Sequence, residues 1–202
     1  ESLDLYRYFF QMKQKGIKYV VMEVSSHALD LKRVQGMDFD VAIFTNITQD
    51  HLDYHKSIEN YLEAKSKLFK QVRESGYSII NIDDSHSNYI INANNGKLYT
   101  YGLANTSDLY AENIKLQLQG VGFEVEGDMN FYANLDITGK FNVYNSLAAI
   151  ATARVLGVDK KVIKEGIEKV TGVPGRFELI KKGQEFAVVV DYAHTPDGME
   201  NV

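Results

Sequence analysis

A short apolar run followed at once by polar side chains places the strongest constraint on how this chain can fold. Residues 41–44 (Val-Ala-Ile-Phe) are typical of a buried β-strand, and a helix is expected to open near Ser57. Between them, residues 45–55 hold two histidines, two aspartates and an asparagine. In an open α/β sheet, ligands bind beyond the carboxyl ends of the strands. The sequence therefore predicts a ligand site at this edge of a sheet.

A second strand of the same kind is expected upstream, at residues 19–22 (Tyr-Val-Val-Met), which run directly into Glu23. If the two strands are neighbours, Glu23 and His51 face one crevice, where a carboxylate and an imidazole can share a divalent cation. An ordinary surface carboxylate at a strand end is the alternative interpretation of Glu23. The spacing alone leaves both interpretations open.

The rest of the chain alternates helices with strands and then changes to consecutive strands. Helices are expected at 2–15, 57–76, 83–93, 142–156 and 159–170, and further parallel strands at 77–82 and 97–101. Strands at 111–118, 120–126 and 129–137, joined by glycine turns, predict an antiparallel meander. The expected fold class is α/β: a mostly parallel sheet flanked by helices, with a small antiparallel sheet attached.

A clear break follows at residues 171–175 (Thr-Gly-Val-Pro-Gly), before two more expected strands at 176–181 and 185–190. We take this break as a domain boundary, which gives domains of 1–173 and 174–202. Because the chain opens on Glu1 without a methionine and stops soon after an apparent helix start, we expect it to be part of a longer protein.

Composition narrows the class of protein. The chain has 202 residues, 45% hydrophobic content and a net charge of -5, so it lacks the basic footprint of a nucleic-acid-binding protein. No apolar run approaches the roughly 20 residues of a membrane span, and no signal peptide is visible. Zero cysteines exclude disulfides and thiolate metal sites and fit a reducing, cytoplasmic location.

Lys65 falls on an otherwise apolar helical stripe that includes Tyr61, Leu62, Leu68 and Phe69. In one interpretation, its stem is buried while its ammonium group reaches water. In the other, burial beside a cation lowers its pKa, and the neutral amine reacts with carbon dioxide to give a carbamate, which is an anionic oxygen ligand. The helical spacing does not decide between the two.

Two further groups of polar residues suit an anionic or nucleotide ligand. Ser25 and Arg33 follow the Glu23 strand, and a hydroxyl and a guanidinium there fit an anion, although helix capping and a surface arginine explain them equally. Asn142 and Asn145 lie one turn apart at an expected helix start. Asn142 is expected to cap that helix, which would leave Asn145 to bind a base edge or ribose.

The cluster Asp50, His51, Asp53 and His55 also has the composition of a transition-metal site, so by itself it allows a metal-dependent phosphoesterase. A solvated polar loop is the ordinary alternative. The chain contains no Gly-x-x-x-x-Gly-Lys-[Ser/Thr] stretch. A nucleotide-dependent enzyme would therefore have to keep its phosphate loop upstream of Glu1.

Seven stretches taken together resemble the Mur ligases of bacterial cell-wall synthesis, and within them the branch that adds the third amino acid. They are residues 1–5 (Glu-Ser-Leu-Asp-Leu), 22–29 (Met-Glu-Val-Ser-Ser-His-Ala-Leu), 44–55 (Phe-Thr-Asn-Ile-Thr-Gln-Asp-His-Leu-Asp-Tyr-His), 61–65 (Tyr-Leu-Glu-Ala-Lys), 139–149 (Gly-Lys-Phe-Asn-Val-Tyr-Asn-Ser-Leu-Ala-Ala), 175–178 (Gly-Arg-Phe-Glu) and 191–197 (Asp-Tyr-Ala-His-Thr-Pro-Asp). They follow the family order across nearly the whole chain, and jointly they are highly specific.

The resemblance implies an ATP-dependent, amide-forming ligase. ATP would phosphorylate the D-glutamate carboxylate of a UDP-N-acetylmuramoyl dipeptide, the amine of an amino acid would attack the acyl phosphate, and phosphate would leave. Mg²⁺ would neutralise the charge of the transferring phosphoryl group. The partners implied are this dipeptide, ATP and an amino acid, with no nucleic acid and no membrane.

The resemblance also assigns roles to residues of this chain. It implies that Glu23, His51 and a carbamylated Lys65 are the Mg²⁺ ligands and the catalytic residues. Residues implied on the substrate side are Ser25 and Arg33, and those implied on the ATP side are Asn142, Asn145, Arg176 and Asp191. Leu31 departs from relatives that have glutamine there, so one polar substrate contact is expected to be absent.

The resemblance also shows which family segments are missing from these 202 residues. These are the uridine-binding domain, the phosphate loop, a Thr-Thr pair before Glu1, and most of the C-terminal domain that selects the amino acid. Three other functions remain as competitors: a folylpolyglutamate synthase of the same superfamily, the phosphoesterase, and a nucleotide-binding module without catalysis.

Overall fold

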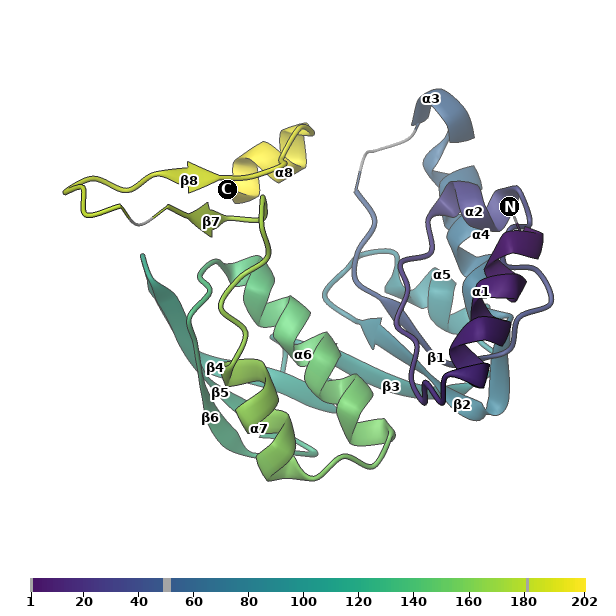
Figure 1. Ribbon diagram of the computed structural model, residues 1–202, viewed down its shortest axis with the longest axis horizontal. Coiled ribbons are helices and arrows are strands. Elements are labelled where there is room, and N and C mark those ends of the chain that lie inside the picture. Colours follow the sequence, from purple (N-terminus) through teal and green to yellow (C-terminus); the bar gives the residue numbers. More distant parts are fainter. Residues whose placement is uncertain (1, 49–51, 181) are drawn as a thin grey trace.

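The computed structural model describes residues 2–48, 52–180 and 182–202 (Figure 1). The helices are α1 (Ser2–Gln14), α2 (Ser26–Asp30), α3 (Leu52–His55), α4 (Ile58–Phe69), α5 (Ser87–Asn92), α6 (Lys140–Val155), α7 (Lys160–Glu168) and α8 (Pro196–Asn201). The strands are β1 (Phe39–Phe44), β2 (Val72–Asn81), β3 (Lys97–Gly102), β4 (Leu109–Gln117), β5 (Gly120–Gly127), β6 (Phe131–Leu135), β7 (Glu178–Leu179) and β8 (Val189–Val190).

One six-stranded sheet with the order β1-β2-β3-β4-β5-β6 organises the molecule. Strand β1 pairs with β2, β2 with β3 and β3 with β4 in parallel, whereas β4, β5 and β6 form an antiparallel meander. The predicted α/β class and the predicted meander are therefore confirmed. The meander continues the parallel sheet through the short β3–β4 pairing, so the two parts share one surface for helices to cover.

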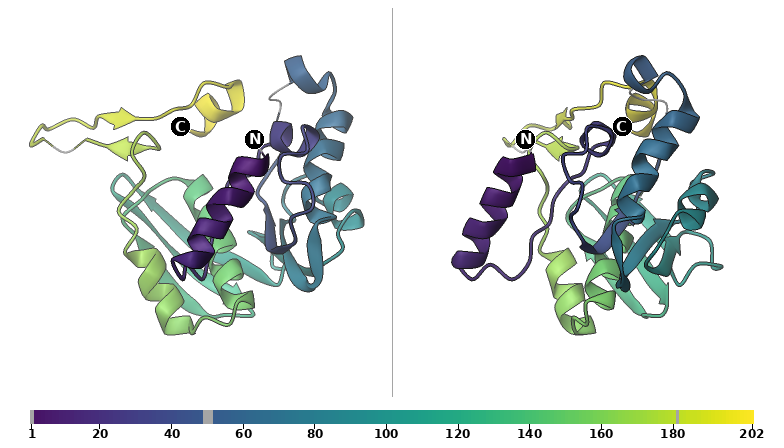
Figure 2. Two further views of the ribbon diagram at one scale, coloured as in Figure 1. Left: turned by 45° about the vertical axis from the view of Figure 1, so that its right-hand side comes forward. Right: turned by 90° about the vertical axis from the view of Figure 1, so that its right-hand side faces the viewer.

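Two hydrophobic layers lie on opposite faces of this sheet. Successive side chains of a strand point to opposite faces, and in β2 both Ile79 and Ile80 are fully buried but belong to different core clusters. Ile79 packs with residues of α6 and the meander, and Ile80 packs with residues of α4. Figure 2 shows α6 and α7 against the meander, with α4 and α5 on the other side of the parallel strands. Burial on both faces is typical of a parallel sheet.

The predicted strand at residues 19–22 is wrong. These residues are extended but join no sheet among the described residues, and the side chain of Val21 is 96% exposed. A strand needs a neighbour for its backbone hydrogen bonds, and β1 pairs with β2 only, so its other edge carries no strand within the described residues. The local sequence favoured a strand, but no described partner exists to form one.

The helix predicted from Ser57 ends earlier than expected. Ser57 caps α4 by accepting a hydrogen bond from the Asn60 amide, as predicted, but α4 ends at Phe69 and β2 begins at Val72. Gly76 therefore lies inside a strand. A Cβ atom at this position would lie 2.6 Å from the Asp40 carbonyl oxygen of the neighbouring strand. Close approach of two backbones, and not the end of a helix, explains this glycine.

The helix that carries Asn142 begins two residues earlier than predicted. Its N-cap position is Gly139, with φ of 99°, and Asn142 already lies inside the helix. The Asn142 side chain donates to the Thr138 carbonyl oxygen at 2.7 Å, so the prediction that it is the N-cap is wrong. Glycine was not recognised as a cap because it has no side chain to accept a hydrogen bond.

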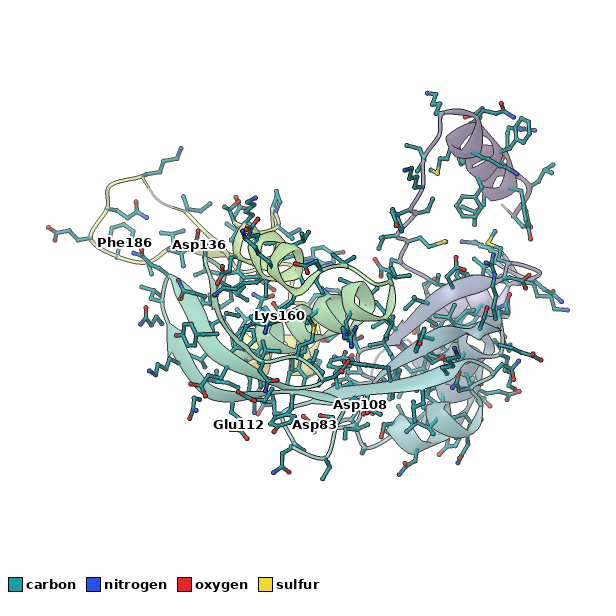
Figure 3. The ribbon with its side chains drawn as sticks, turned by 90° about the horizontal axis from the view of Figure 1, so that it is seen from below. Asp83, Asp108, Glu112, Asp136, Lys160 and Phe186 are labelled. Atoms are coloured by element: carbon teal, nitrogen blue, oxygen red, sulfur yellow. The ribbon has the colours of Figure 1, made fainter. Side chains whose placement is uncertain are left out.

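The N-terminal helix and the C-terminal segment lie at the periphery (Figure 1). None of the side chains of α1, all of which are described, is buried, and the helix packs through Leu5 and Phe9 on a small cluster around Val34. In Figure 3, α1 stands apart from the main body. The strands expected at 176–181 and 185–190 shorten to the two-residue strands β7 and β8, which form a separate antiparallel sheet.

Within the described parts of the chain, none of the helices has both the length and the apolar character needed to cross a membrane.

Candidate functional site

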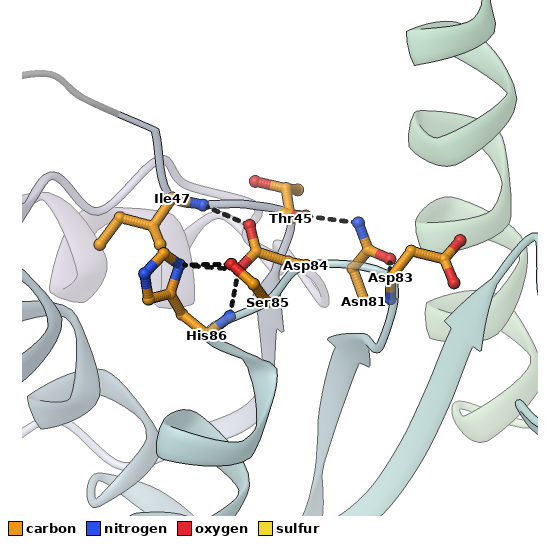
Figure 4. Close-up of polar contacts among 7 residues, drawn as sticks. All are labelled: Thr45, Ile47, Asn81, Asp83, Asp84, Ser85 and His86. Carbon is orange, nitrogen blue, oxygen red and sulfur yellow. Dashed lines mark hydrogen bonds and ion pairs between the residues drawn. The ribbon is translucent and has the colours of Figure 1, made fainter.

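The carboxyl ends of β1 and β2 meet at one edge of the sheet, where polar loops follow both strands (Figure 4). After β1, residues 45–48 form an irregular loop. After β2, the Asp84 carboxylate accepts the Ile47 amide at 2.8 Å, and the Asn81 side chain donates to the Thr45 carbonyl oxygen at 2.8 Å. Two side chains, one from the last residue of β2 and one from the turn after it, therefore hold the loop that follows β1.

The same turn after β2 reaches helix α6. The Asp83 carboxylate accepts the Leu103 amide at 2.6 Å and the Tyr144 hydroxyl at 2.9 Å. Burial, and next the hydrogen bond to Asp83, raise the pKa of Tyr144 well above its usual range, so its hydroxyl remains a donor at neutral pH. The start of α6, which holds Asn142 and Asn145, is thereby tied to the sheet edge.

Asn142 and Asn145 lie on the first two turns of α6, as their spacing predicted. The Asn145 side-chain amide is exposed and donates to the Asn142 side-chain oxygen at 3.3 Å. Asn142 is partly buried because it also holds Thr138. Asn145 is thus the more accessible of the two for a ligand.

Lys65 is partly buried on α4, and its ammonium nitrogen lies 5.2 Å from the centre of the Tyr61 ring. Tyr61 in turn stacks on His55, with ring centres 5.1 Å apart and an interplanar angle of 16°. The predicted position of Lys65 on the apolar side of this helix is therefore confirmed. The stacked rings of Tyr61 and His55 lie beside it.

His55 joins α3 to the helices around it. Its Nε2 atom lies 2.9 Å from the Ser26 hydroxyl, and both side chains are buried. Its carbonyl oxygen accepts the Asn60 side-chain amide at 2.9 Å. These contacts give His55 a structural function, in contrast to the metal-ligand role that a phosphoesterase would require of it.

Asp30 makes the polar contacts on the outer side of this aromatic cluster. Its carboxylate accepts the Lys67 ammonium at 2.8 Å and the Tyr54 hydroxyl at 2.9 Å. These two hydrogen bonds, with that of Lys67 the larger, hold the pKa of Asp30 below its usual value. Both partners come from helices that follow the polar loop, so Asp30 fixes α2 against α4.

Glu23 and Arg33 lie in one hollow beside α1. Both side chains are exposed and line a hollow of about 230 Å³ between α1 and α2. The other lining residues are Asp4, Leu5, Tyr8, Met22, Ala28 and Val34. Ser25 accepts the Ala28 amide at 3.1 Å, so it caps α2, as one of its two interpretations predicted.

His51 and Asp50 lie outside the described residues, so the predicted pairing of Glu23 with His51 stays a prediction. Within residues 2–48, 52–180 and 182–202, no group of three or more histidine, aspartate or glutamate side chains is arranged to hold a metal ion. Asp53 is exposed, and His55 is buried against Ser26.

Arg176 and Asp191 lie on the two chain segments next to β7 and β8. The Asp191 carboxylate accepts the Phe177 and Ala193 amides, both at 2.6 Å. The Arg176 guanidinium lies 5.4 Å from the centre of the Tyr192 ring. Phe177 contacts Phe141 of α6, with ring centres 6.0 Å apart, so this segment reaches the helix that carries Asn142 and Asn145.

Four residues at this edge of the sheet are not predicted by the motifs in the sequence: Asn81, Asp83, Asp84 and Tyr144. A signal for the first three was present, because an Asn-Ile-Asp-Asp stretch follows an apolar strand just as residues 45–55 do. The aspartates were assigned only to a helix start. No local signal could have found Tyr144, because its partner Asp83 lies 61 positions away.

A family model and two related sequences all match this chain over most or all of its length. The model of the Mur ligase middle domain matches residues 1–153. The UDP-N-acetylmuramoyl-L-alanyl-D-glutamate--2,6-diaminopimelate ligase of Caldanaerobacter subterraneus subsp. tengcongensis is 49% identical over 203 residues, which are 100% of this chain and 42% of that protein. The ligase of the same name from Bacillus licheniformis is 46% identical over 209 residues, again 100% of this chain and 43% of that protein.

A solved structure of a UDP-N-acetylmuramoyl-L-alanyl-D-glutamate--2,6-diaminopimelate ligase superposes with a TM-score of 0.79 at 35% identity, over 92% of this chain and 39% of that one. The chain thus spans less than half the length of these relatives. The segment that the family model matches contains the sheet edge, α4 and most of α6. On the match of the family model and the shared fold, the chain belongs to the Mur ligase family.

Proposed function

We propose that the chain is part of an ATP-dependent ligase that adds the third amino acid to UDP-N-acetylmuramoyl-L-alanyl-D-glutamate. In this proposal, residues 1–173 are most of the central ATPase domain, without its phosphate loop, and 174–202 are the start of the C-terminal domain. The observation that carries the proposal is the sheet edge, where the 45–48 loop and the start of α6 converge on the turn after β2. The similarity of the whole chain to ligases of this name supports it.

The proposed reaction has two steps. The γ-phosphoryl group of ATP passes to the D-glutamate carboxylate, which gives an acyl phosphate and ADP. The amine of the incoming amino acid then attacks the acyl carbon, an amide bond forms, and phosphate leaves. On the ATP side, Asn145 is exposed on α6, and Arg176 and Asp191 lie on the segment that contacts α6 through Phe177.

The proposed metal ligands are Glu23, His51 and a carbamylated Lys65. Carboxylate and carbamate oxygens with one imidazole form a donor set that suits Mg²⁺. Two observations support this set: the Glu23 side chain is exposed after the extended segment, and the Lys65 side chain is partly buried on α4. Bound Mg²⁺ would supply charge neutralisation for phosphoryl transfer. Lys65 would contribute an anionic oxygen that its own ammonium form lacks.

Ser25 and Arg33 are the proposed residues on the UDP-sugar peptide side. The Arg33 guanidinium is exposed in the hollow beside α1, and its fixed fork of donors suits a phosphate or carboxylate. The Ser25 side-chain oxygen accepts the hydrogen bond that caps α2. Its hydroxyl proton can still be donated to a substrate oxygen.

The test is an assay of the full-length protein that carries this sequence. We expect phosphate release from ATP that requires both the UDP-linked dipeptide and an amino acid. Because the relatives are named for 2,6-diaminopimelate, it is the first amino acid to supply, with lysine second. Release of phosphate without the dipeptide, or no release with either amino acid, would contradict the proposal.

The 202-residue chain alone is expected to be inactive. Without the lysine and backbone amides of a phosphate loop, the β- and γ-phosphates of ATP have no cradle. Turnover of about 1 per second or more by the chain alone, a rate typical of enzymes, would show that the proposed domain division is wrong. We place the enzyme in the cytoplasm, where its nucleotide substrates are made.

A further inference from the structure

We propose that the turn after β2, residues 81–84, is a positioning element that fixes the distance between the 45–48 loop and helix α6. We name it the β2 turn. The inference rests on the proposed function, because the loop leads to His51 and α6 carries Asn142 and Asn145. The β2 turn would then set the geometry between the metal side and the nucleotide side of the site.

One arm of the β2 turn holds the 45–48 loop by two bonds of opposite polarity. The Asn81 side chain, which is 7% exposed, donates to the Thr45 carbonyl oxygen, while Asp84 accepts the Ile47 amide (Figure 4). The other oxygen of Asp84 accepts the His86 amide at 2.8 Å. The backbone of the loop is therefore fixed at two positions by side chains that are themselves held.

The other arm of the β2 turn holds α6. A single oxygen of Asp83 accepts both the Leu103 amide and the Tyr144 hydroxyl. Gly102 makes this possible, because a Cβ atom there would lie 2.9 Å from the carboxylate atoms of Asp83. Tyr144 lies between Asn142 and Asn145 in the sequence. Its hydrogen bond to Asp83 therefore fixes where the first two turns of α6, which carry both asparagines, lie relative to the sheet edge.

The two arms share one covalent unit. Asn81 also accepts the Asp83 amide at 3.1 Å, which closes the β2 turn on itself. Three consecutive strands and α6 thus meet at four residues. The β2 turn is thus a common base from which each arm holds its own partner, so the loss of one arm should release that partner and leave the other in place.

The experiment uses two variants of the full-length ligase, each of which cuts one arm. Tyr144→Phe removes only the hydroxyl that donates to Asp83. Asn81→Asp is isosteric but replaces the donor to Thr45 with an oxygen, which repels the carbonyl. Asp108→Asn is the matched control, since the Asp108 carboxylate lies outside the β2 turn and accepts the Thr100 amide and hydroxyl, each at 2.7 Å.

We expect Tyr144→Phe to raise KM for ATP by about three- to tenfold, the net effect of one typical hydrogen bond, without a change in KM for the dipeptide. We expect Asn81→Asp to raise the Mg²⁺ concentration at half-maximal rate by a similar factor without a change in KM for ATP. A merely structural role would lower stability in both variants but would not separate these two constants.

Hydrogen exchange gives a readout that does not depend on activity. Exchange of the Ile47 amide should accelerate in Asn81→Asp only, and exchange in the first turns of α6 should accelerate in Tyr144→Phe only. If both variants behave like Asp108→Asn, or if each moves both regions equally, the positioning role is overturned. An inactive wild-type enzyme would instead refute the proposed function, while the exchange pattern would still decide the role of the β2 turn.

Discussion

The ammonium nitrogen of Lys65 lies 5.2 Å from the centre of the Tyr61 ring, one helical turn earlier on α4. Such a contact favours a cation over the face of an aromatic ring. A carbamate would carry the opposite charge, which the face of the ring does not favour. The two interpretations of Lys65 therefore predict opposite charges beside Tyr61: a cation for the ammonium group and an anion for the carbamate. Substitutions that change this charge can distinguish them.

Substitution of Lys65 tests the carbamate directly. We expect Lys65→Ala to abolish activity of the full-length enzyme and added acetate or formate to restore part of it, because a small carboxylate would occupy the vacated position. Lys65→Glu should keep some activity for the same reason. The measurement is the ligase rate with and without the added acid.

Two variants serve as controls for this series. Lys65→Arg keeps a positive charge but cannot form a carbamate, so it should be inactive. Lys67→Ala removes a lysine two residues away that pairs with Asp30, and it should leave the rate near that of the wild type. If arginine works as well as lysine at position 65, the residue acts as a cation and the carbamate role is wrong.

His51 is expected to act on the reaction and not on substrate binding. His51→Ala should lower kcat strongly and leave affinity for the UDP-linked dipeptide nearly unchanged, because a metal ligand acts on charge that develops at the phosphoryl group. Asp53→Asn in the same stretch is the control and should have little effect, since Asp53 is exposed. A near-normal kcat in His51→Ala would contradict the metal-ligand role and return His51 to the interpretation of a solvated polar loop.

Tyr101 predicts how stability depends on alkaline pH. Burial, above all other causes, raises the pKa of its fully buried phenol far above the usual value of about 10. Above pH of about 10 the unfolded chain releases this proton while the folded chain keeps it. The free energy of unfolding should therefore be unaffected by this group below pH of about 10 and should fall as the pH rises further.

Urea unfolding at several pH values between neutral and strongly alkaline checks this expectation. Tyr101→Phe should weaken the alkaline decline, because the titrating group is gone. It should cost about 1 kcal/mol at neutral pH, because the hydroxyl donates to the Phe44 carbonyl oxygen. An unchanged alkaline decline in Tyr101→Phe would assign it to other groups, such as Tyr144.

Leu147 tests the layer between α6 and the sheet. The side chain is fully buried in the larger core cluster, so Leu147→Ala should lower the free energy of unfolding by about 2–5 kcal/mol through lost burial and the cavity that remains. Val162→Ala on α7 is the control, since Val162 is 57% exposed and should cost far less. Equal losses in chemical denaturation would show that α6 does not cover the core as described.

Features that depend on neighbouring residues were predictable from the sequence. The α/β class, the meander and the cap of α4 by Ser57 follow from periodicity and turn residues, which act within a few positions along the chain. The position of Lys65 on a partly buried helix side was predictable for the same reason. The combination of motifs also indicated the family, because its residues occur in order along the chain.

Features that depend on distant partners were decided by the tertiary structure. Residues 19–22 have strand propensity but no described neighbour to pair with, and Gly76 lies in a strand because β1 approaches it closely. Asp83 and Tyr144 meet only because α6 packs across the ends of β2 and β3. Propensity is a property of a few consecutive residues, whereas these contacts require the whole sheet to be in place, so only the folded chain could reveal them.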